Sequence, residues 1–404
     1  MMNRNGVIVE MRKTNPLLLL LLSLGVFGII TTEMGIVGVL PQISQKYNIT
    51  ASQAGWLVGI FALIVAVSGP FLTLIASRFN RKSVLLTAIS MFVLSNLVYA
   101  FTSHFEVMLI FRILPAMFHP IFFSIALVAA ASLVPPEQSS QAVVRVFAGI
   151  TVGFAFGVPI TSYLAERISL STSFLFGAIV NAIALIGLLI WLPSMPVKEK
   201  MSYGKQLSIL RKPGLWLNIA AVIFIFAAMF SVYGYFAEYT SQITRMNGSL
   251  ISLMLMVFGL VMIAGNFLFG TLLQKNTTKT ILLFPLLYAF IYVLVYFAGS
   301  YLSLTIGMIF IWGTVHSGGL IVSQTWLTAE TKEAPEFGNS LFVSFSNLGI
   351  TIGTAVAGII IANLGMHQLI WCGVGFSLLA FAAITIKMKL FSDTMQGKDQ
   401  ALGA

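Results

Sequence analysis

Long apolar segments alternate with short polar ones along almost the whole chain. A helix that spans a bilayer needs about 20 mainly apolar residues, and twelve such stretches can be placed here. We place them at 17–40, 55–76, 83–102, 106–130, 143–165, 171–193, 215–239, 250–273, 280–299, 302–327, 338–362 and 367–388. The pattern predicts an all-α integral membrane protein with twelve transmembrane helices.

The first apolar stretch has a rival interpretation as a cleaved signal peptide, because Arg4, Arg12 and Lys13 precede a run of leucines. We prefer a retained helix. The stretch is long enough to span a bilayer, and no small-residue cleavage site follows before Pro41.

The composition narrows the class of protein further. Apolar residues make up 58% of the 404 and charged residues only 8%, far from the values of a soluble globular chain. The single cysteine, Cys372, leaves no internal disulfide and no Cys/His metal spacing. No GxxxxGK[ST] loop for ATP is present. We therefore expect no metal, no cofactor and an ion gradient as the source of energy.

The basic residues predict an orientation in the membrane. The net charge is +10, which could also suggest nucleic acid as a partner. However, most Lys and Arg residues gather in alternate loops, and only Lys46, Arg167 and Arg245 fall in the other set. Cytoplasmic loops carry such an excess of positive charge. We predict that both termini are cytoplasmic, with the lipid bilayer and no nucleic acid as partner.

The polar segment 196–214 divides six predicted spans from six. Duplicated halves of this kind bind a substrate between them near the middle of the membrane. We predict a six-helix bundle at 1–195, a cytoplasmic linker at 196–214, a second six-helix bundle at 215–390 and a cytoplasmic tail at 391–404. The two bundles should be related by pseudo-symmetry.

Three ionisable residues of the first half lie well inside predicted spans. Glu33 is the only such acid, and Arg112 and His119 lie two helical turns apart in the fourth span. A charge there must be paired, hydrated or neutralised, and a histidine titrates near neutral pH. We predict that these residues carry protons, with Glu33 and Arg112 interacting directly or through water. Structural pairing is the alternative for each of them.

Aromatic and polar residues in the second half suggest a site for a solute. Phe226, Phe230 and Tyr233 share one face of the seventh span, and Trp312 and His316 share one face of the tenth. In the eleventh span, polar residues recur every three or four positions: Ser340, Ser344, Asn347, Thr351 and Thr354. We predict that the aromatic residues, His316 and Asn347 bind the substrate; ordinary helix packing is the alternative.

Two further motifs suggest conformational roles. Gly149, Gly153 and Gly157 lie four apart in the fifth span, where a neighbouring helix could approach closely, and Pro159 follows. Packing alone could also explain this run. Arg78, Arg81 and Lys82 form a tight basic turn after the second span, and we assign them to gating together with the glycines and Pro159.

Local motifs in the first and fourth spans resemble the major facilitator superfamily, and within it the bacterial drug and metabolite proton antiporters of the sugar, arabinose-polymer and purine efflux subgroup. The first span reads Thr31-Thr32-Glu33-Met34-Gly35 and then Gly38-Val39-Leu40-Pro41, similar to that group's Thr-Glu and Gly-Leu-Leu-Pro pattern. Arg112 matches the motif arginine, and His119 with Phe122-Phe123 is similar to a stretch of the sugar-efflux subgroup. The likeness covers roughly 15–390 and implies the two-bundle fold and proton antiport.

Two motifs depart from that family. Its turn between the second and third helices reads Gly-x-Leu-Ala-Asp-Arg-x-Gly-Arg-Lys. In this chain Thr73 and Asn80 stand at the positions of the two glycines and Ser77 at that of the Asp, and Arg78, Arg81 and Lys82 are retained. Val158 separates Gly157 from Pro159 in a motif that elsewhere ends in Gly-Pro. The charge latch that the family's Asp would supply is therefore not expected in this chain.

Together these features predict a monomeric, proton-coupled secondary transporter in a bacterial inner membrane, which exports drugs or sugar-like metabolites by alternating access. Proton-linked uptake or facilitated diffusion of a sugar-like or nucleobase-like solute is the alternative within transport. A non-transporting membrane protein on the same fold is a second alternative. An enzyme is not expected, because Glu33, Arg112 and His119 supply neither a metal nor a nucleophile.

Overall fold

The computed structural model describes residues 16–76, 79–135, 138–196, 208–331 and 335–391. Within these residues the chain is helical, with no strand. Twelve of the described segments are long and apolar enough to cross a membrane. Each predicted span coincides with one of them, so the protein is a multi-pass membrane protein as the sequence predicts.

The N-terminal half comprises the first six spans. Its elements are α1 (Pro16–Met34), η1 (Gly35–Val39), α2 (Leu40–Tyr47), α3 (Ala51–Ala76), α4 (Arg81–Phe101), α5 (Phe105–Ser132), α6 (Ser139–Val152), η3 (Gly153–Gly157), α7 (Val158–Arg167) and α8 (Leu170–Trp191). Within this half α4 packs against α5 and α8, and α1 packs against α6 and α8.

The C-terminal half comprises the last six spans. Its elements are η4 (Ser208–Arg211), α10 (Pro213–Tyr233), α11 (Phe236–Gln242), α12 (Gly248–Lys275), α13 (Thr277–Ala298), α14 (Leu302–Thr328), α15 (Pro335–Leu364), η5 (Met366–Gln368) and α16 (Leu369–Leu390). Here α10 lies between α15 and α16, and α12 packs against α14.

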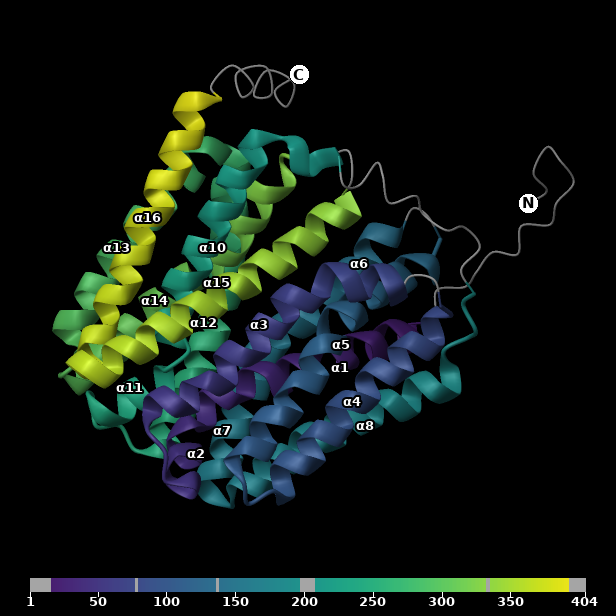
Figure 1. Cartoon of the computed structure of the whole chain (residues 1–404), viewed down its shortest axis with the longest axis horizontal. Helices are drawn as coiled ribbons and strands as arrows, with labels where there is room; N and C mark the ends of the chain where they lie inside the picture. The colour runs from purple at the N-terminus through teal and green to yellow at the C-terminus, as the bar shows by residue number, and fades with distance from the viewer. Residues whose placement is uncertain (1–15, 77–78, 136–137, 197–207, 332–334, 392–404) are drawn as a thin grey trace, which may run out of the picture.

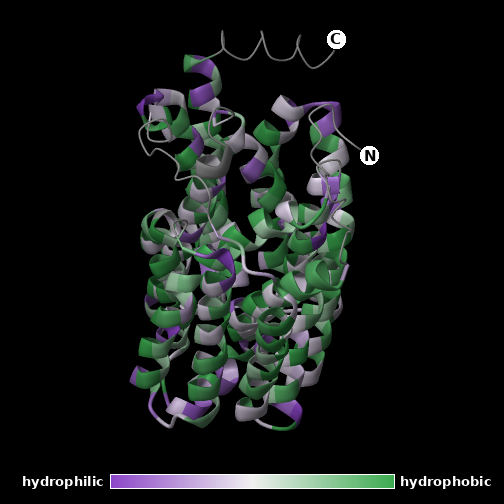
Figure 2. Cartoon of the chain, turned by 90° about the vertical axis from the view of Figure 1, so that its right-hand side faces the viewer, coloured by the Kyte–Doolittle hydropathy of each residue, from purple (hydrophilic) through white to green (hydrophobic). Residues whose placement is uncertain are grey.

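The two halves lie side by side and meet along two pairs of helices. In Figure 1 the purple-to-teal helices α1 to α8 occupy the lower right, and the teal-to-yellow helices α10 to α16 the upper left. The contacts between halves run chiefly through α3 with α15, and through η3 and α7 with α12. Figure 2 shows apolar residues along the middle of the helices, with polar residues gathered toward both ends.

Short elements of both halves meet at one end of the molecule. Figure 1 shows α2, α7 and α11 together at the lower left, and we call this the far end. The opposite end, where α1 begins and α16 ends, is the terminal end. At the far end the Ser252 hydroxyl donates to the Ser162 hydroxyl at 2.9 Å. Nearer the middle of the spans, the Thr351 hydroxyl of α15 donates to the Gly59 carbonyl of α3 at 3.2 Å. The halves are therefore in direct contact at the far end.

Three spans that the apolar pattern predicts as continuous helices are interrupted. The first changes from α to 3-10 helix at Gly35, and the fifth contains a π-helical turn over Gly153–Gly157. The seventh ends at Tyr233 and resumes as α11 at Phe236. Such interruptions free backbone groups from regular pairing, and they are tolerated in membranes only where the protein supplies other partners.

The glycine run allows two helices of the N-terminal half to touch. A Cβ on Gly149 would overlap the Ser23 carbonyl, and one on Gly153 would lie 2.8 Å from the Cβ of Ile30. A Cβ on Gly157 would overlap the Thr31 hydroxyl. Close approach to α1 thus accounts for the run, in agreement with the packing alternative. Pro159 is buried near the start of α7.

The basic turn is attached to the end of α8. The Lys82 ammonium donates to the Leu189 carbonyl at 2.8 Å, and the Arg81 amide donates to the Met195 carbonyl at 3.2 Å. These contacts stay within the N-terminal half, so the gating role of Arg81 and Lys82 remains a prediction. Arg78, the linker stretch 197–207 and the tail 392–404 lie outside the described residues, and the predicted domain boundaries remain predictions.

Candidate functional site

Arg112 stabilises the break in the first span. Its side chain is fully buried, and its guanidinium donates to three main-chain carbonyls: Thr32 at 2.8 Å, Glu33 at 2.6 Å and Leu57 at 3.0 Å. The α-helical pattern of hydrogen bonds ends one residue after Glu33, so the carbonyls of Thr32 and Glu33 need other donors. Leu57 lies inside α3, and its carbonyl accepts from Arg112 in addition to its place in that helix. The guanidinium carbon also lies 4.5 Å from the centre of the Phe61 ring. A buried cation is thus surrounded by carbonyl dipoles and an aromatic face.

The Glu33 carboxylate faces His119. Its Oε2 lies 3.0 Å from the Nε2 of His119, and both side chains are almost wholly buried. The ring is not aligned for a regular hydrogen bond, and neither of its nitrogens has a hydrogen-bond partner among the described residues. Phe123 packs beside the histidine ring at 4.6 Å, and Phe61 meets it edge-on at 5.8 Å. The pair therefore sits in an apolar enclosure.

The structure revises the predicted pairing within this group of residues. Arg112 does interact with Glu33, but its hydrogen bond goes to the main-chain oxygen. The carboxylate instead has His119 as its close partner. Arg112 and His119 both belong to α5. The change of α1 into the 3-10 helix η1 after Met34 sets which of them faces the Glu33 carboxylate. The three residues predicted to carry protons are thus close together, with separate partners.

Two asparagines that the sequence reasoning missed hold α1 in place. The amide of Asn96 donates to the Thr32 hydroxyl at 2.8 Å, and the amide of Asn181 donates to the same oxygen at 3.1 Å. Asn181 also donates to the Gly28 carbonyl at 3.1 Å. An asparagine in the middle of a membrane span is energetically unfavourable unless its amide bonds to another helix. Its position in the span could therefore have identified each of these residues from the sequence. They join α4 and α8 to the residue before Glu33.

Four of the six predicted substrate residues form one buried cluster in the C-terminal half. The His316 ring lies 4.9 Å from Tyr233 and 5.9 Å from Phe230. The Nδ1 of His316 is 2.7 Å from the Tyr288 hydroxyl, which also accepts from the indole nitrogen of Trp312 at 3.1 Å. The Nε2 of His316 has no partner among the described residues. Aromatic surface and an unpartnered ring nitrogen suit recognition of an organic molecule.

The other two predicted substrate residues, Phe226 and Asn347, form no hydrogen bond with this cluster. Phe226 stacks on Phe230 at 6.2 Å and meets Phe342 edge-on at 5.8 Å, so it extends the cluster toward α15. The Asn347 amide donates to the Val343 carbonyl of its own helix. Its side-chain oxygen lacks a partner among the described residues. A role for Asn347 in substrate binding remains a prediction.

The sequence reasoning also missed cluster members in α12 and α13. Tyr292 donates to the Tyr288 hydroxyl at 3.1 Å and to the Ala228 carbonyl at 2.7 Å. Phe258 stacks on Tyr233 at 5.0 Å. Tyr288 and Tyr292 lie four residues apart, which puts them on one helix face. That spacing in the sequence could have indicated that they belong to one aromatic cluster.

The two groups of residues are linked across the interface between halves. Phe154 of η3 lies 6.1 Å from Tyr233 in the aromatic cluster. A Cβ on Gly69 of α3 would lie 2.9 Å from Ser344 of α15 and 3.5 Å from Pro120, the residue after His119. No group of three His, Cys, Asp or Glu residues able to hold a metal is found in the described part of the chain.

Two six-helix halves around buried titratable and aromatic groups are the arrangement of a membrane transporter. The family model described as the Major Facilitator Superfamily matches residues 22–336 and 237–396. The chain belongs to this family. Its members are transporters, so the protein is assigned as a transporter and not as an enzyme.

Curated relatives cover most of the chain. The inner membrane transport protein YdhP of Escherichia coli is 31% identical over 349 residues, which are 86% of this chain and 90% of the relative. A probable sugar efflux transporter of Helicobacter pylori is 29% identical over 373 residues, 91% of this chain and 95% of the relative. The putative transporter AraJ of Escherichia coli is 29% identical over 62% of this chain and 64% of the relative.

Solved structures share the fold at low sequence identity. A bacterial homologue of the human lysosomal transporter Spinster, inward-facing and unoccupied, superposes with a TM-score of 0.75 at 18% identity, covering 93% of this chain and 97% of that one. The nucleoside transporter NupG superposes with a TM-score of 0.72 at 12% identity, covering 93% of this chain and 99% of that one. The predicted two-bundle fold is confirmed.

Proposed function

We propose that the protein is a proton-coupled exporter of small organic molecules, drugs or sugar-like metabolites, in a bacterial inner membrane. Relatives that are named as inner membrane and sugar efflux transporters support this proposal. The distribution of Lys and Arg supports a cytoplasmic terminal end, so the far end faces outward. The proton gradient supplies the energy, without a cofactor, and the monomer is the working unit.

The buried contact between Glu33 and His119 carries the proposal. A carboxylate and an imidazole 3.0 Å apart can hold a variable number of protons. Arg112 keeps a fixed positive charge beside them, bound to main-chain carbonyls rather than to the acid. Each proton gained or lost therefore changes the net charge of a buried group. Such a change is costly in the apolar enclosure and cheap when water enters, which ties proton exchange to opening and closing.

The aromatic cluster around His316 is the proposed substrate site. Tyr288, Tyr292, Trp312 and His316 are joined by hydrogen bonds, and the Nε2 of His316 remains to recognise a solute. The contact between Phe154 and Tyr233 connects this cluster to the helix break of the fifth span. Substrate binding in one half can therefore affect the half that carries the protons.

Proton release from purified protein tests the coupling. Candidate lipophilic cations, sugars and nucleosides are added to wild type, Glu33→Gln and His119→Gln in weakly buffered solution, and the pH change is recorded. We expect a ligand that releases protons from wild type to release none from Glu33→Gln. Glu106→Gln, an exposed acid in the first turn of α5, is the matched control and should behave as wild type.

The outcomes separate coupling from direction. Unchanged release from Glu33→Gln would make that residue structural and refute the coupling mechanism. Transport of the same ligand into inverted vesicles under an imposed proton gradient gives the direction. Accumulation only in right-side-out vesicles would mean proton-linked uptake in place of export.

A further inference from the structure

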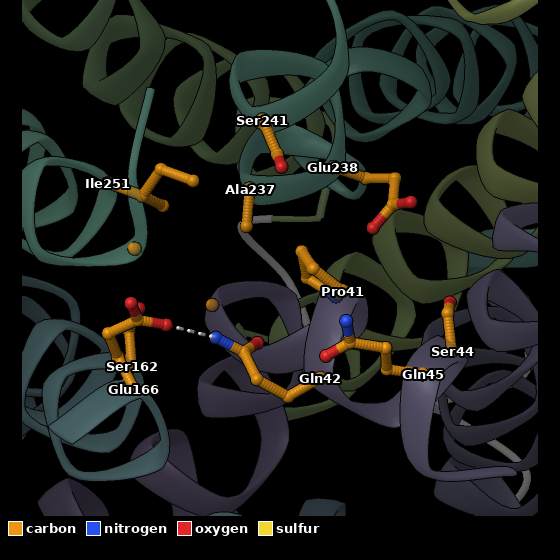
Figure 3. A pocket seen from close by; sticks show the side chains of 12 residues that line it. Pro41, Gln42, Ser44, Gln45, Ser162, Glu166, Ala237, Glu238, Ser241 and Ile251 are labelled. Atoms are coloured by element: carbon orange, nitrogen blue, oxygen red, sulfur yellow. Dashed lines mark hydrogen bonds between the residues drawn. The ribbon is translucent and has the colours of Figure 1, made fainter. Parts of the chain in front are cut away.

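A cavity of about 340 Å³ lies at the far end between the two halves. Residues of η1, α2 and α7 line it from the N-terminal half, and residues of α11 and α12 from the C-terminal half (Figure 3). Its size is at the lower limit of small-molecule sites. The cavity is separate from the Glu33 and His316 groups described above.

The lining is polar and carries negative charge only. It contains the carboxylates Glu166 and Glu238, two glutamine amides and three serine hydroxyls. No lysine or arginine lines it. An acidic concave surface with apolar walls concentrates cations and disfavours anions.

Glu238 is the buried charge of this cavity. The residue is only 6% exposed, and α11 lies beyond the end of the seventh span. Its Oε1 accepts from the amide of Gln242 at 2.6 Å, whereas its Oε2 has no partner among the described residues. Figure 3 shows this carboxylate pointing into the space between α11 and α2. An unpartnered buried carboxylate oxygen is costly, so the site is built for a donor that the chain does not supply.

The other buried atoms of the lining that lack a partner are also oxygens. The Oε1 of Gln42 and the hydroxyl of Ser44 are buried without a partner within the described part of the chain. The amide of Gln42 reaches the exposed Glu166 carboxylate only at 3.4 Å. The cavity thus offers several acceptors and a negative charge. A ligand that fits must bring a positive charge and several N–H or O–H donors.

We propose that this cavity binds a small primary-ammonium compound, with Glu238 as its counter-ion and Gln42 and Ser44 as further hydrogen-bond partners. A primary ammonium has three N–H donors, which a quaternary ammonium lacks. A neutral polyol would leave the Glu238 charge uncompensated. A transition metal is disfavoured, because the described residues include no group of three His, Cys, Asp or Glu side chains.

Binding at this position depends on the relative placement of the two halves. Gln42 and Ser44 belong to one half and Glu238 to the other. A ligand that contacts both halves binds best when the far end is closed, and it shifts the population toward that state. This goes beyond the proposed proton coupling and does not depend on it.

Equilibrium binding to the full chain in lipid nanodiscs tests the proposal. Radiolabelled ethanolamine is the probe, because it combines a primary ammonium with a hydroxyl in a small volume. Choline, which has no N–H, and ethylene glycol, which has no charge, are competitors at neutral pH. We expect saturable 1:1 binding of ethanolamine, and at least about tenfold weaker competition by both controls, the factor expected for loss of one charge-assisted hydrogen bond.

Variants locate the bound probe. We expect Glu238→Gln to weaken binding about tenfold or more, because it removes the charge and keeps the shape. Ser241→Trp, which fills the cavity without changing its charge, should abolish binding. Glu106→Gln removes an exposed acid that does not line the cavity and should leave the dissociation constant within about twofold. Size-exclusion profiles and helical circular dichroism check that each variant is folded.

Several results would overturn the proposal. Absence of saturable binding to wild type would do so, as would binding that Glu238→Gln and Ser241→Trp leave unchanged. Equal binding of choline would refute the role of the N–H donors. None of these results affects proton release by Glu33, which is measured separately, so the two proposals can fail independently.

Discussion

Replacement of Arg112 is the sharpest test of how the first span is built. Arg112→Gln removes the guanidinium that serves the carbonyls of Thr32, Glu33 and Leu57. It leaves these oxygens buried beside an amide that can reach one of them at most. We expect the protein to be destabilised and the break in α1 to become disordered.

The magnitude follows from the number and type of bonds. A hydrogen bond to a charged group contributes about 1.5 to 3 kcal/mol, so three would amount to roughly 5 to 9 kcal/mol if they added independently. Burying the guanidinium costs several kcal/mol in desolvation, which the substitution recovers. We expect a net loss of about 3 to 5 kcal/mol, typical of a broken buried charge site.

Two measurements check this expectation. Unfolding in mixed detergent micelles with increasing sodium dodecyl sulfate gives the change in free energy of unfolding, and hydrogen exchange reports the amides of 35–39. Arg145→Gln is the control, because Arg145 is an exposed arginine in the same half. Unchanged unfolding and unchanged exchange in Arg112→Gln would refute the idea that Arg112 holds the helix break together.

Three further predictions concern the contact between halves, the far-end carboxylate and the terminal end. Gly259→Ala places a methyl group against the backbone of η3 and should lower the free energy of unfolding by about 1 to 3 kcal/mol in the same assay. In the control Gly270→Ala the new methyl group meets no atom within 4 Å, so the protein should not be destabilised. Burial raises the pKa of Glu238 above its ordinary value of 4.5. The folded state therefore binds this proton more tightly than the unfolded state, and its stability falls as the pH rises from that ordinary value through the raised pKa. Glu238→Gln should be the more stable protein above this window, with no difference in acid; a constant difference at every pH would contradict the assignment. Lys387→Met breaks the buried ion pair between the Lys387 ammonium and the Glu330 carboxylate, which are 3.0 Å apart. It should lower the free energy of unfolding by about 3 to 5 kcal/mol. Lys389 is exposed, and Lys389→Met should change the unfolding midpoint little.

The spans could be predicted from sequence because the membrane imposes a simple rule. Each needs about 20 apolar residues with its backbone groups paired internally, and the predicted bounds agree with the structure within several residues for nearly every helix. The interruptions were missed for the same reason. A 3-10 turn at Gly35 or a π-turn at Gly153 leaves the apolar pattern unchanged, and only the partners of the freed carbonyls reveal it.

The burial of Glu33, Arg112 and His119 was easier to predict than their partners. Placing an ionisable side chain in the bilayer is energetically costly, and this cost draws attention to Glu33, Arg112 and His119 from the sequence alone. Which base faces the acid depends on how α1 turns after Thr32, and the buried asparagines Asn96 and Asn181 help to set that turn. Glu238 escaped notice because a glutamate at the end of an apolar stretch is usually exposed to water. Its burial depends on the break that separates α11 from α10.

The π-turn η3 contacts both halves, so a movement in one half can be transmitted to the other through it. On one side, the glycines of the fifth span touch α1 immediately before Glu33 through Ile30 and Thr31. On the other side, Phe154 meets the aromatic cluster at Tyr233. A π-turn carries one more residue than the regular helix and can be absorbed by a small change in register. A movement of α1 that follows protonation of Glu33 would therefore reach the substrate cluster through η3, without any direct contact between the two sites.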